Sequence, residues 1–420
     1  MLRDVLIAGA YGAAASVALL ALQPFLKRRR VRDQYRERIR DIQTLYKLKN
    51  SNGMEVHIIP VGCAIQRLIV PDKNGKLDDV VLGCDDVISY LDGSSPYFGA
   101  IVGRCANRIS NASFSIRGKI AKLAANAGTA SLHGGIQGFD KAVWKCKDGV
   151  VETKLGHSIT FTHVSPSGDE GYPGTVEATV TYTLTSDSNQ LITEMSATTT
   201  EDTIINLAQH SYFNLSGHKS GNVLDHVLKI YGDHYTPLGE DMVTTGEILP
   251  VRGTPLDFTS QKDIGLHIAS LPGGYDHNYI LHSMGPLARF VVKNGMYSTS
   301  PKLAASVFDP ASGRCMDVKT TAPAMQFYTG NFLNGVKGKD GGRYMKHSGF
   351  CLETQVGKLS CIYRRIQTLP PTNVPSMLIN SAVDGLQGFP DAVNKPNFPS
   401  VVLKPGETYK HVLVYRFYSA

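Results

Sequence analysis

From residue 46 onward the chain is a series of short alternating runs without sustained helical periodicity. Runs such as 64–70, 174–184 and 411–417 are short and strand-like, and clusters of Gly, Asn, Asp and Pro separate such runs along the chain. A period of two indicates β-strands with one buried face. Many short strands separated by turns predict an all-β domain, an antiparallel sandwich or barrel.

Length and composition are consistent with one large domain and additional segments. The chain has 420 residues, 42% of them apolar, and its final strand-like run indicates that the domain 46–420 is continuous. The seven cysteines are odd in number and lack CxxC spacing. This pattern argues against a disulfide framework and against a zinc site.

Residues 1–45 have a different composition. The stretch 5–26 is almost wholly apolar and, at about 1.5 Å per residue, is long enough to cross a hydrocarbon core of about 30 Å. The stretch 27–40 that follows holds eight basic and two acidic residues, which account for most of the net charge of +7. The rest of the chain is close to neutral, so no nucleic-acid partner is indicated.

We interpret 5–26 as a membrane-anchor helix, because the apolar run ends in Lys-Arg-Arg-Arg and not in a cleavage site. The positive-inside rule then predicts a membrane-anchored protein whose folded domain faces the cytosol. An organelle-targeting presequence, a signal peptide or a soluble helix, and hence an organellar or soluble cytoplasmic protein, are the alternatives. Residues 31–45 predict a short charged helix that acts as a spacer.

Two apolar runs carry polar residues on one face. Alternation in 203–215 places His210 and Tyr212 on one side of a predicted strand, and alternation in 349–355 does the same for Glu353. An imidazole and a carboxylate set into apolar strands indicate an acid/base pair. The alternative for each is a hydrogen-bonded structural residue of the core.

Four further segments, 103–109, 131–135, 274–279 and 323–332, are dense in polar residues. Together they supply amides, a guanidinium group, carboxylates, imidazoles and tyrosines, without metal-ligand spacing. This mixture suits a neutral polyhydroxylated ligand, because each hydroxyl both donates and accepts a hydrogen bond. Taken singly, each segment is equally consistent with a turn.

The motifs taken together resemble the galactose mutarotase, or aldose 1-epimerase, family. The resemblance runs from about residue 46 to 418 and implies a large antiparallel β-sandwich whose concave face holds a free aldose. It implies that His210 is the general acid and Glu353 the general base. The motifs are 106–109, 132–135, 169–174, 206–215, 274–277, 326–332, 349–355 and 389–396, and the implied sugar-binding residues are Asn107, Arg108, His133, Tyr212, Asp276 and Gln326.

The implied reaction interconverts the α and β anomers of free hexoses such as glucose and galactose. A base takes the proton of the anomeric hydroxyl while an acid protonates the ring oxygen, so the ring opens and can close on either face. One acid and one base suffice, so we expect no cofactor and no metal. Glu353 is expected to be ionised and His210 protonated at the start, with Arg108 fixing the hydroxyls.

Two other functions are alternatives. A membrane-tethered sugar-binding or sensing module without turnover would need neither His210 nor Glu353. A hexose-phosphate epimerase would need additional cations for the phosphate, whereas the motifs contain only Arg108 and the nearby Arg104.

Residues 356–387 depart from the family pattern, in which Glu-Thr-Gln runs almost directly into Phe-Pro-Asp-Ala-Val-Asn. The insert begins with Val and ends with Gln, whose codons are compatible with the GT and AG ends of an intron. We interpret the insert as a retained intron. A genuine surface loop or lid over the sugar is the alternative.

Overall fold

The computed structural model describes residues 23, 25–35, 39–239, 241–281, 300–355, 389–398 and 400–420. Its largest sheet has nine strands, and every pairing within it is antiparallel. In order across the sheet these are β10 (Lys145–Glu152), β11 (Gly156–Ser165), β12 (Val176–Thr185), β13 (Gln190–Thr199), β28 (Tyr409–Ser419), β22 (Arg314–Thr320), β21 (Lys302–Phe308), β16 (Val227–Ile230) and β19 (Lys262–Asp263).

Two further antiparallel sheets complete the main architecture. The five-stranded sheet has the order β18 (Leu249–Pro250), β17 (Gly232–Thr236), β20 (Asp276–Leu281), β23 (Ala324–Tyr328) and β26 (Cys351–Gln355). The four-stranded sheet has the order β1 (Tyr46–Lys49), β2 (Glu55–Ile59), β3 (Ala64–Pro71) and β4 (Leu77–Asp79). The antiparallel all-β architecture predicted from the alternating runs is confirmed.

Short pairs and helical turns connect these sheets. The strand pairs are β14 (Thr203–Ile204) with β27 (Val402–Leu403), β15 (Ala208–Gln209) with β5 (Ile101–Val102), β24 (Val336–Lys337) with β25 (Arg343–Tyr344), β6 (Arg108–Ile109) with β9 (Ser131–Leu132), and β7 (Ser113–Ile116) with β8 (Lys119–Lys122). Besides the helical residues 25–34, the described helices are α2 (Ile39–Ile42), α3 (Ile88–Leu91), η2 (Ser110–Ala112), η3 (Asp169–Gly171), η4 (Ile264–Ser270), η6 (Lys339–Gly341) and η7 (Ala392–Asn394).

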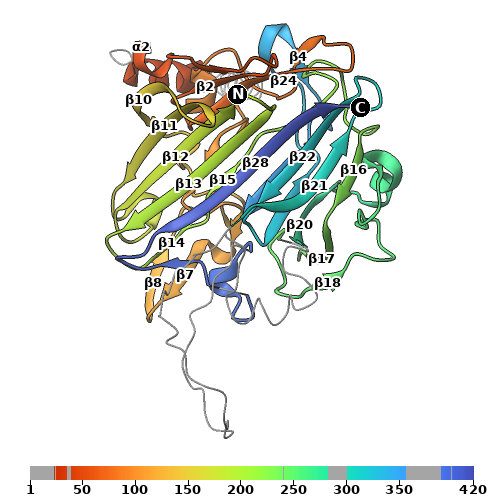
Figure 1. The fold of residues 1–420 in the computed structure, drawn as a ribbon. Helices are drawn as coiled ribbons and strands as arrows, with labels where there is room; N and C mark the ends of the chain where they lie inside the picture. Colours follow the sequence, from red (N-terminus) through yellow and green to blue (C-terminus); the bar gives the residue numbers. More distant parts are fainter. Residues whose placement is uncertain are drawn as a thin grey trace, which may run out of the picture.

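The C-terminal strand lies inside the large sheet. Figure 1 shows β28 crossing the middle of this sheet, where it pairs with β13 on one side and β22 on the other. The largest sheet is therefore completed only by β28, which includes the strand predicted over 411–417.

The main core lies between the sheets. Tyr279, Phe327 and Leu352 of the five-stranded sheet belong to one apolar cluster with Tyr182 and Tyr415 of the nine-stranded sheet. Because side chains alternate along a strand, the residues between them on β20, β23 and β26 face the other way. The opposite face of the five-stranded sheet is where the predicted site residues lie.

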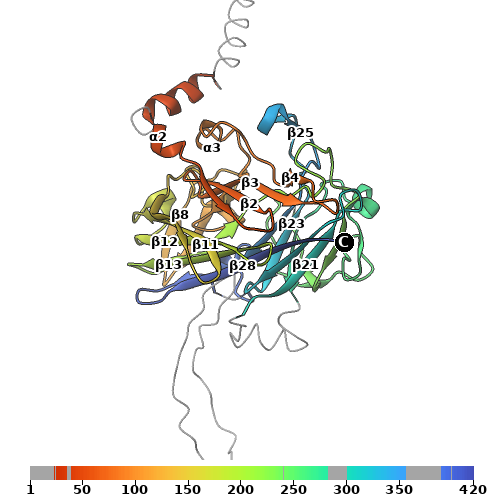
Figure 2. The same ribbon diagram turned by 45° about the horizontal axis from the view of Figure 1, so that its top comes forward.

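Helices precede β1. Residues 25–34 are helical, and the Arg28 guanidinium pairs with the carboxylates of Asp86 and Asp92. Val31 and Tyr35 pack against an apolar cluster that includes α3, and Figure 2 shows α2 and α3 at the same end of the molecule. The division at residue 45 stays a prediction.

Within the described ranges, no helix is long and apolar enough to cross a membrane. This finding contradicts the predicted membrane-anchored location. Of the anchor predicted over 5–26, only residues 23, 25 and 26 belong to the described part of the chain.

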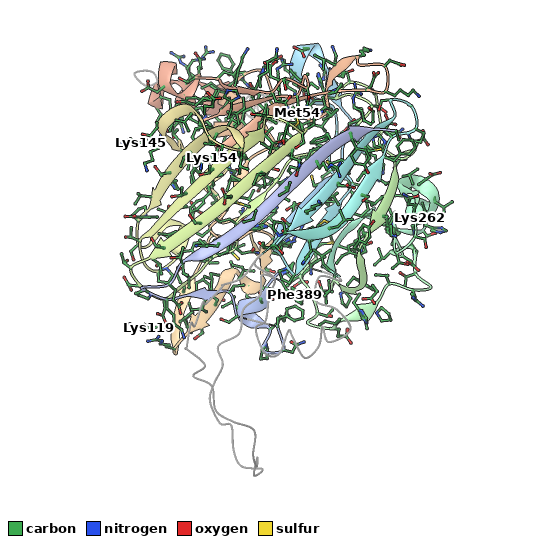
Figure 3. The ribbon with its side chains drawn as sticks, viewed as in Figure 1. Met54, Lys119, Lys145, Lys154, Lys262 and Phe389 are labelled. Carbon is green, nitrogen blue, oxygen red and sulfur yellow. The ribbon has the colours of Figure 1, made fainter. Side chains whose placement is uncertain are left out.

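The insert 356–387 lies wholly outside the described residues, so its interpretation stays a prediction. The next described residue is Phe389, which Figure 3 shows below the large sheet. Its ring packs edge to face on Phe398, with 5.0 Å between centroids.

Candidate active site

Three adjacent strands of the five-stranded sheet contribute one wall of the site. Glu353 on β26 is the register partner of Gln326 on β23, and Gln326 is in turn the partner of Asn278 on β20. The Gln326 Nε2 donates to Asp276 Oδ1 at 2.7 Å. Alternation thus brings an amide and two carboxyl groups from three strands onto one face.

The opposite wall comes from the pair β6–β9. Asn107 precedes β6 and His133 follows β9, and the two are linked through their backbones and through the Asn107 N–H, which donates to His133 Nδ1 at 3.2 Å. A neutral imidazole whose Nδ1 accepts must carry its hydrogen on Nε2. His133 is therefore a hydrogen-bond donor.

Unusual backbone conformations hold this wall. Asn107 and His133 have φ values of 65° and 49°, in the left-handed region that few residues with a side chain adopt. Gly134 follows with φ of 90°, and a Cβ there would lie 1.8 Å from the Gly103 oxygen. Only glycine permits this approach.

The two walls meet where Arg108 faces Asp276, and His210, which follows β15, lies between Glu353 of one wall and His133 of the other. His210 Nε2 lies 3.4 Å from Glu353 Oε1, and Arg108 Nη1 lies 3.8 Å from Asp276 Oδ2. The His133 and His210 rings are 5.0 Å apart, so these residues follow one another in a closed order of strand register, hydrogen bonds and ring contacts. We call this set the polar circuit; in order it is Glu353, Gln326, Asp276, Arg108, Asn107, His133 and His210.

The run 203–215 is not the continuous strand predicted from its alternation. It is entirely buried, yet it forms only β14 and β15 and then bridges from Phe213 to Val81 and Phe350. The backbone exchanges pairing partners along its length, which a local pattern does not reveal. The predicted side-chain geometry nevertheless holds at the site, because the His210 and Tyr212 rings lie 5.2 Å apart.

Burial controls the ionisation of the acid/base pair. It raises the pKa of Glu353 to about 8, to which the neighbouring Asp276 adds while Arg108 opposes. Burial lowers the pKa of His210 to about 4. In the sugar-free site near pH 7, the pair therefore holds one proton on Glu353, which differs from the expected glutamate carboxylate and imidazolium. Desolvation penalises both charges, and the neutral arrangement contains the same number of protons.

Several buried polar atoms on this face make no hydrogen bond within the described part of the chain. Leaving such an atom unpaired costs about 1–3 kcal/mol. These atoms lie on the same face as Glu353, which indicates that a bound ligand supplies their hydrogen-bond partners. They are Glu353 Oε2, Gln326 Oε1, Gln355 Nε2 and Asn278 Oδ1.

His133, His210 and Glu353 also place three ligand atoms within 4.8 Å of one another, close enough to share a divalent cation. Two of the three, His210 and Glu353, are the groups proposed for proton transfer. The expectation of metal-independent chemistry stays a prediction.

Two residues of the site were missed from the sequence. Cys351 Sγ lies 3.8 Å from His210 Nδ1, and alternation on β26 places it on the face of Glu353. The ring of Tyr97 lies 4.7 Å from that of His133 and 5.6 Å from that of His210. Tyr97 comes from a loop without a polar motif, so only the fold identifies it.

Arg104 does not reach the polar circuit. It is buried and donates to Ser165 Oγ and to the carbonyl oxygens of Ser165, Pro166, Pro173 and Gly174. Arg104, the second cation that the sequence placed near the site, therefore has its guanidinium group hydrogen-bonded to backbone carbonyl oxygens.

An antiparallel β-sandwich with a buried carboxyl and imidazole, surrounded by amides and an arginine, has the groups that an enzyme acting on a neutral carbohydrate requires. The chain belongs to the aldose 1-epimerase family, whose model matches residues 44–357. Members of this family are isomerases, and the resemblance inferred from the motifs is confirmed.

Individual relatives agree over most of their length. The chain is 41% identical over 369 residues to galactose mutarotase of Bos taurus and 40% to that of Homo sapiens, covering 87% of this chain and 92% of each relative. It is 31% identical over 380 residues to aldose 1-epimerase of Escherichia coli (strain K12). A crystal structure of an aldose epimerase homologue from C. elegans superposes with a TM-score of 0.72 at 26% identity, covering 90% of this chain and 99% of that one.

Proposed function

We propose that the enzyme interconverts the α and β anomers of free aldohexoses, with His210 and Glu353 as the groups that transfer protons. The 3.4 Å contact between His210 Nε2 and Glu353 Oε1 carries this proposal. The anomeric oxygen O1 and the ring oxygen O5 are both bonded to C1. Because the two oxygens share one carbon, the group that takes a proton from O1 and the group that gives one to O5 must lie close together.

The reaction conserves the protons of the pair. One group takes the proton from O1, the C1–O5 bond breaks, and the other group gives a proton to O5. With a bound sugar, transfer across the 3.4 Å contact produces the imidazolium of His210 and the carboxylate of Glu353, which act as acid and base. After rotation about C1–C2 the steps reverse on the other face of the aldehyde.

This scheme requires the pair to hold one proton in total. The one-proton state is the main state between the pKa of His210, about 4, and the pKa of Glu353, about 8. We expect kcat/KM to be bell-shaped in pH, with a plateau between about 4 and about 8. The two limbs belong to the coupled pair and not to single residues.

The remaining members of the polar circuit are proposed to bind hydroxyl groups. Asp276 and Gln326 Oε1 accept, whereas Arg108, Asn107 and the His133 Nε2–H donate. Tyr212 packs beside His210 and supports the sugar ring.

A neutral sugar suits this site better than a phosphorylated one. Arg108 faces Asp276, and Arg104 is engaged by carbonyl oxygens. A sensing module without turnover has no use for an acid/base pair whose members are 4% and 3% exposed.

The test is polarimetry on glucose and galactose with His210→Asn, Glu353→Gln and the double variant. Each single change should lower kcat by about 10²- to 10⁴-fold. Acid and base act in one step, so the double variant should be little worse than the poorer single variant. Galactose binding, measured by calorimetry, should persist in Glu353→Gln. A Glu353→Gln enzyme with wild-type kcat would refute the assignment.

A further inference from the structure

Tyr97 lies between the two histidines of the polar circuit and an apolar cluster. Its ring contacts those of His133 and His210, at 4.7 Å and 5.6 Å between centroids. The ring packs against an apolar cluster of Val102, Ala106 and Ala208, and it is only partly buried. Its backbone has φ of 64°, in the left-handed region that is a true outlier for a bulky residue. The fold thus holds an aromatic wall beside the two histidines.

The order of the circuit can be compared with the order of atoms in a pyranose ring. Glu353 takes O1 and His210 takes O5, and the next ring atom after O5 is C5, which carries C6. Moving past His210 away from Glu353 leads to His133 and Tyr97. Continuing around the circuit passes Arg108 and Asp276 and returns through Gln326 to Glu353.

We infer that Tyr97 is a specificity-determining residue that packs against the C5–C6 group of the sugar, so that the enzyme favours hexoses over the pentoses that lack this group. The inference rests on the proposed roles of His210 and Glu353, which fix the direction of the ring. It adds an apolar contact for C6, the one exocyclic carbon of the ring.

The charge beside this wall is already neutralised. Lys141 Nζ lies over the Tyr97 ring, 5.6 Å from its centroid, and pairs with Asp140 Oδ2 at 2.8 Å. Both side chains of this ion pair are largely buried. A 6-phosphate would meet Tyr97 and a cation that is already paired, so the wall accepts a neutral CH₂OH group and disfavours a phosphate.

Two sugar pairs isolate C6. L-Arabinose has the ring configuration of D-galactose without C6, and D-xylose has that of D-glucose. For Tyr97→Ala we expect kcat/KM to fall about 10- to 100-fold on the hexoses and at least five-fold less on the matching pentoses. Equal losses on hexose and pentose would overturn the inference.

Tyr97→Phe separates the ring from its hydroxyl. Retention of the wild-type hexose-to-pentose ratio in Tyr97→Phe shows that packing of the ring is the cause. A ratio lowered as far as in Tyr97→Ala would overturn the packing contact.

Tyr231→Ala is the matched control, because Tyr231 also lies under a lysine, with Lys229 Nζ at 4.8 Å, and is not a member of the polar circuit. Its ratio should equal that of the wild type. Thermal unfolding of every variant separates a folding defect from a change in specificity. If Glu353→Gln were fully active, the catalytic proposal would fail whatever the ratio; an unshifted ratio with inactive Glu353→Gln would refute the Tyr97 inference alone.

Discussion

The two faces of the five-stranded sheet are equally buried but chemically opposite. On β23, Phe327 faces the core and its neighbour Gln326 faces the polar circuit. On β26, Leu352 faces the core and its neighbour Glu353 faces the polar circuit. All four are at most 3% exposed. The core face gains free energy from the loss of apolar surface to water. The circuit face instead retains buried polar atoms without hydrogen-bond partners among the described residues. These atoms lower the stability of the free protein, and they are available to bind the hydroxyl groups of a sugar.

The largest expected effect on this comparison comes from Phe327→Ala. The Phe327 ring packs on Phe258 at 5.4 Å and Tyr275 at 5.1 Å, so truncation should lower the free energy of unfolding by about 3–5 kcal/mol. At a temperature where the variant is folded, kcat should stay within a few-fold of wild type. Chemical denaturation and polarimetry on the same sample measure both quantities, and a large loss of kcat with little loss of stability would break the comparison.

Glu353→Gln should have the opposite effect on stability. The pKa of Glu353 in the folded protein, about 8, is above its ordinary value of 4.5. The folded state therefore binds this proton more tightly, and the associated stability is complete below pH 4.5 and is lost as pH rises to about 8. Relative to wild type, the glutamine variant should gain about 2–4 kcal/mol between pH 5 and pH 8. Urea unfolding at the two pH values measures this gain.

Glu177→Gln on an exposed position of β12 is the control for that experiment. It should show no such gain. The low pKa of His210 acts in the other direction, because its contribution is lost as pH falls from 6.5 through about 4. If Glu353→Gln followed the wild type at both pH values, the carboxyl would not be desolvated as described.

Gln326→Leu tests a smaller contribution. The change removes the unpaired Oε1, but it also leaves the buried Asp276 Oδ1 without its donor. The gain and the cost are each about 1–3 kcal/mol, so stability should change little. We expect kcat/KM to fall about 10- to 100-fold, equivalent to about 1.4–2.7 kcal/mol. A parallel loss of stability and activity would show that Gln326 is structural.

The smallest expected effect concerns a polar contact on the core face. Thr354 Oγ1 lies 2.9 Å from His411 Nε2, which also contacts Thr320 Oγ1 at 3.1 Å. Since the imidazole keeps its second partner, Thr354→Val should cost about 0.5–1.5 kcal/mol of stability without changing kcat. A loss of kcat comparable to that of Gln326→Leu would show that the two faces are coupled.

The membrane anchor over 5–26 was predicted from length and hydropathy alone. Only residues 23, 25 and 26 of that stretch are described, and within the described ranges no helix is long and apolar enough to cross a membrane.

The sequence by itself determined the class of fold and the face of each strand. Alternation is a relation between residues i and i+2, so it separates Glu353 from Leu352 without knowledge of any neighbour. The resemblance of the motifs to the family proposed His210, Glu353 and the six binding residues. All of them lie in or beside the polar circuit, and their roles stay predictions.

Only the tertiary structure decided which of these groups meet and in what protonation state. Arg108 and Asp276 come together through pairings between distant segments, and Tyr97 enters the site through a loop whose own sequence has no signal. The pKa values of Glu353 and His210 depend on burial by every element around them, which no local pattern contains. Register and desolvation are long-range properties, and they convert a set of conventional side chains into an acid/base site.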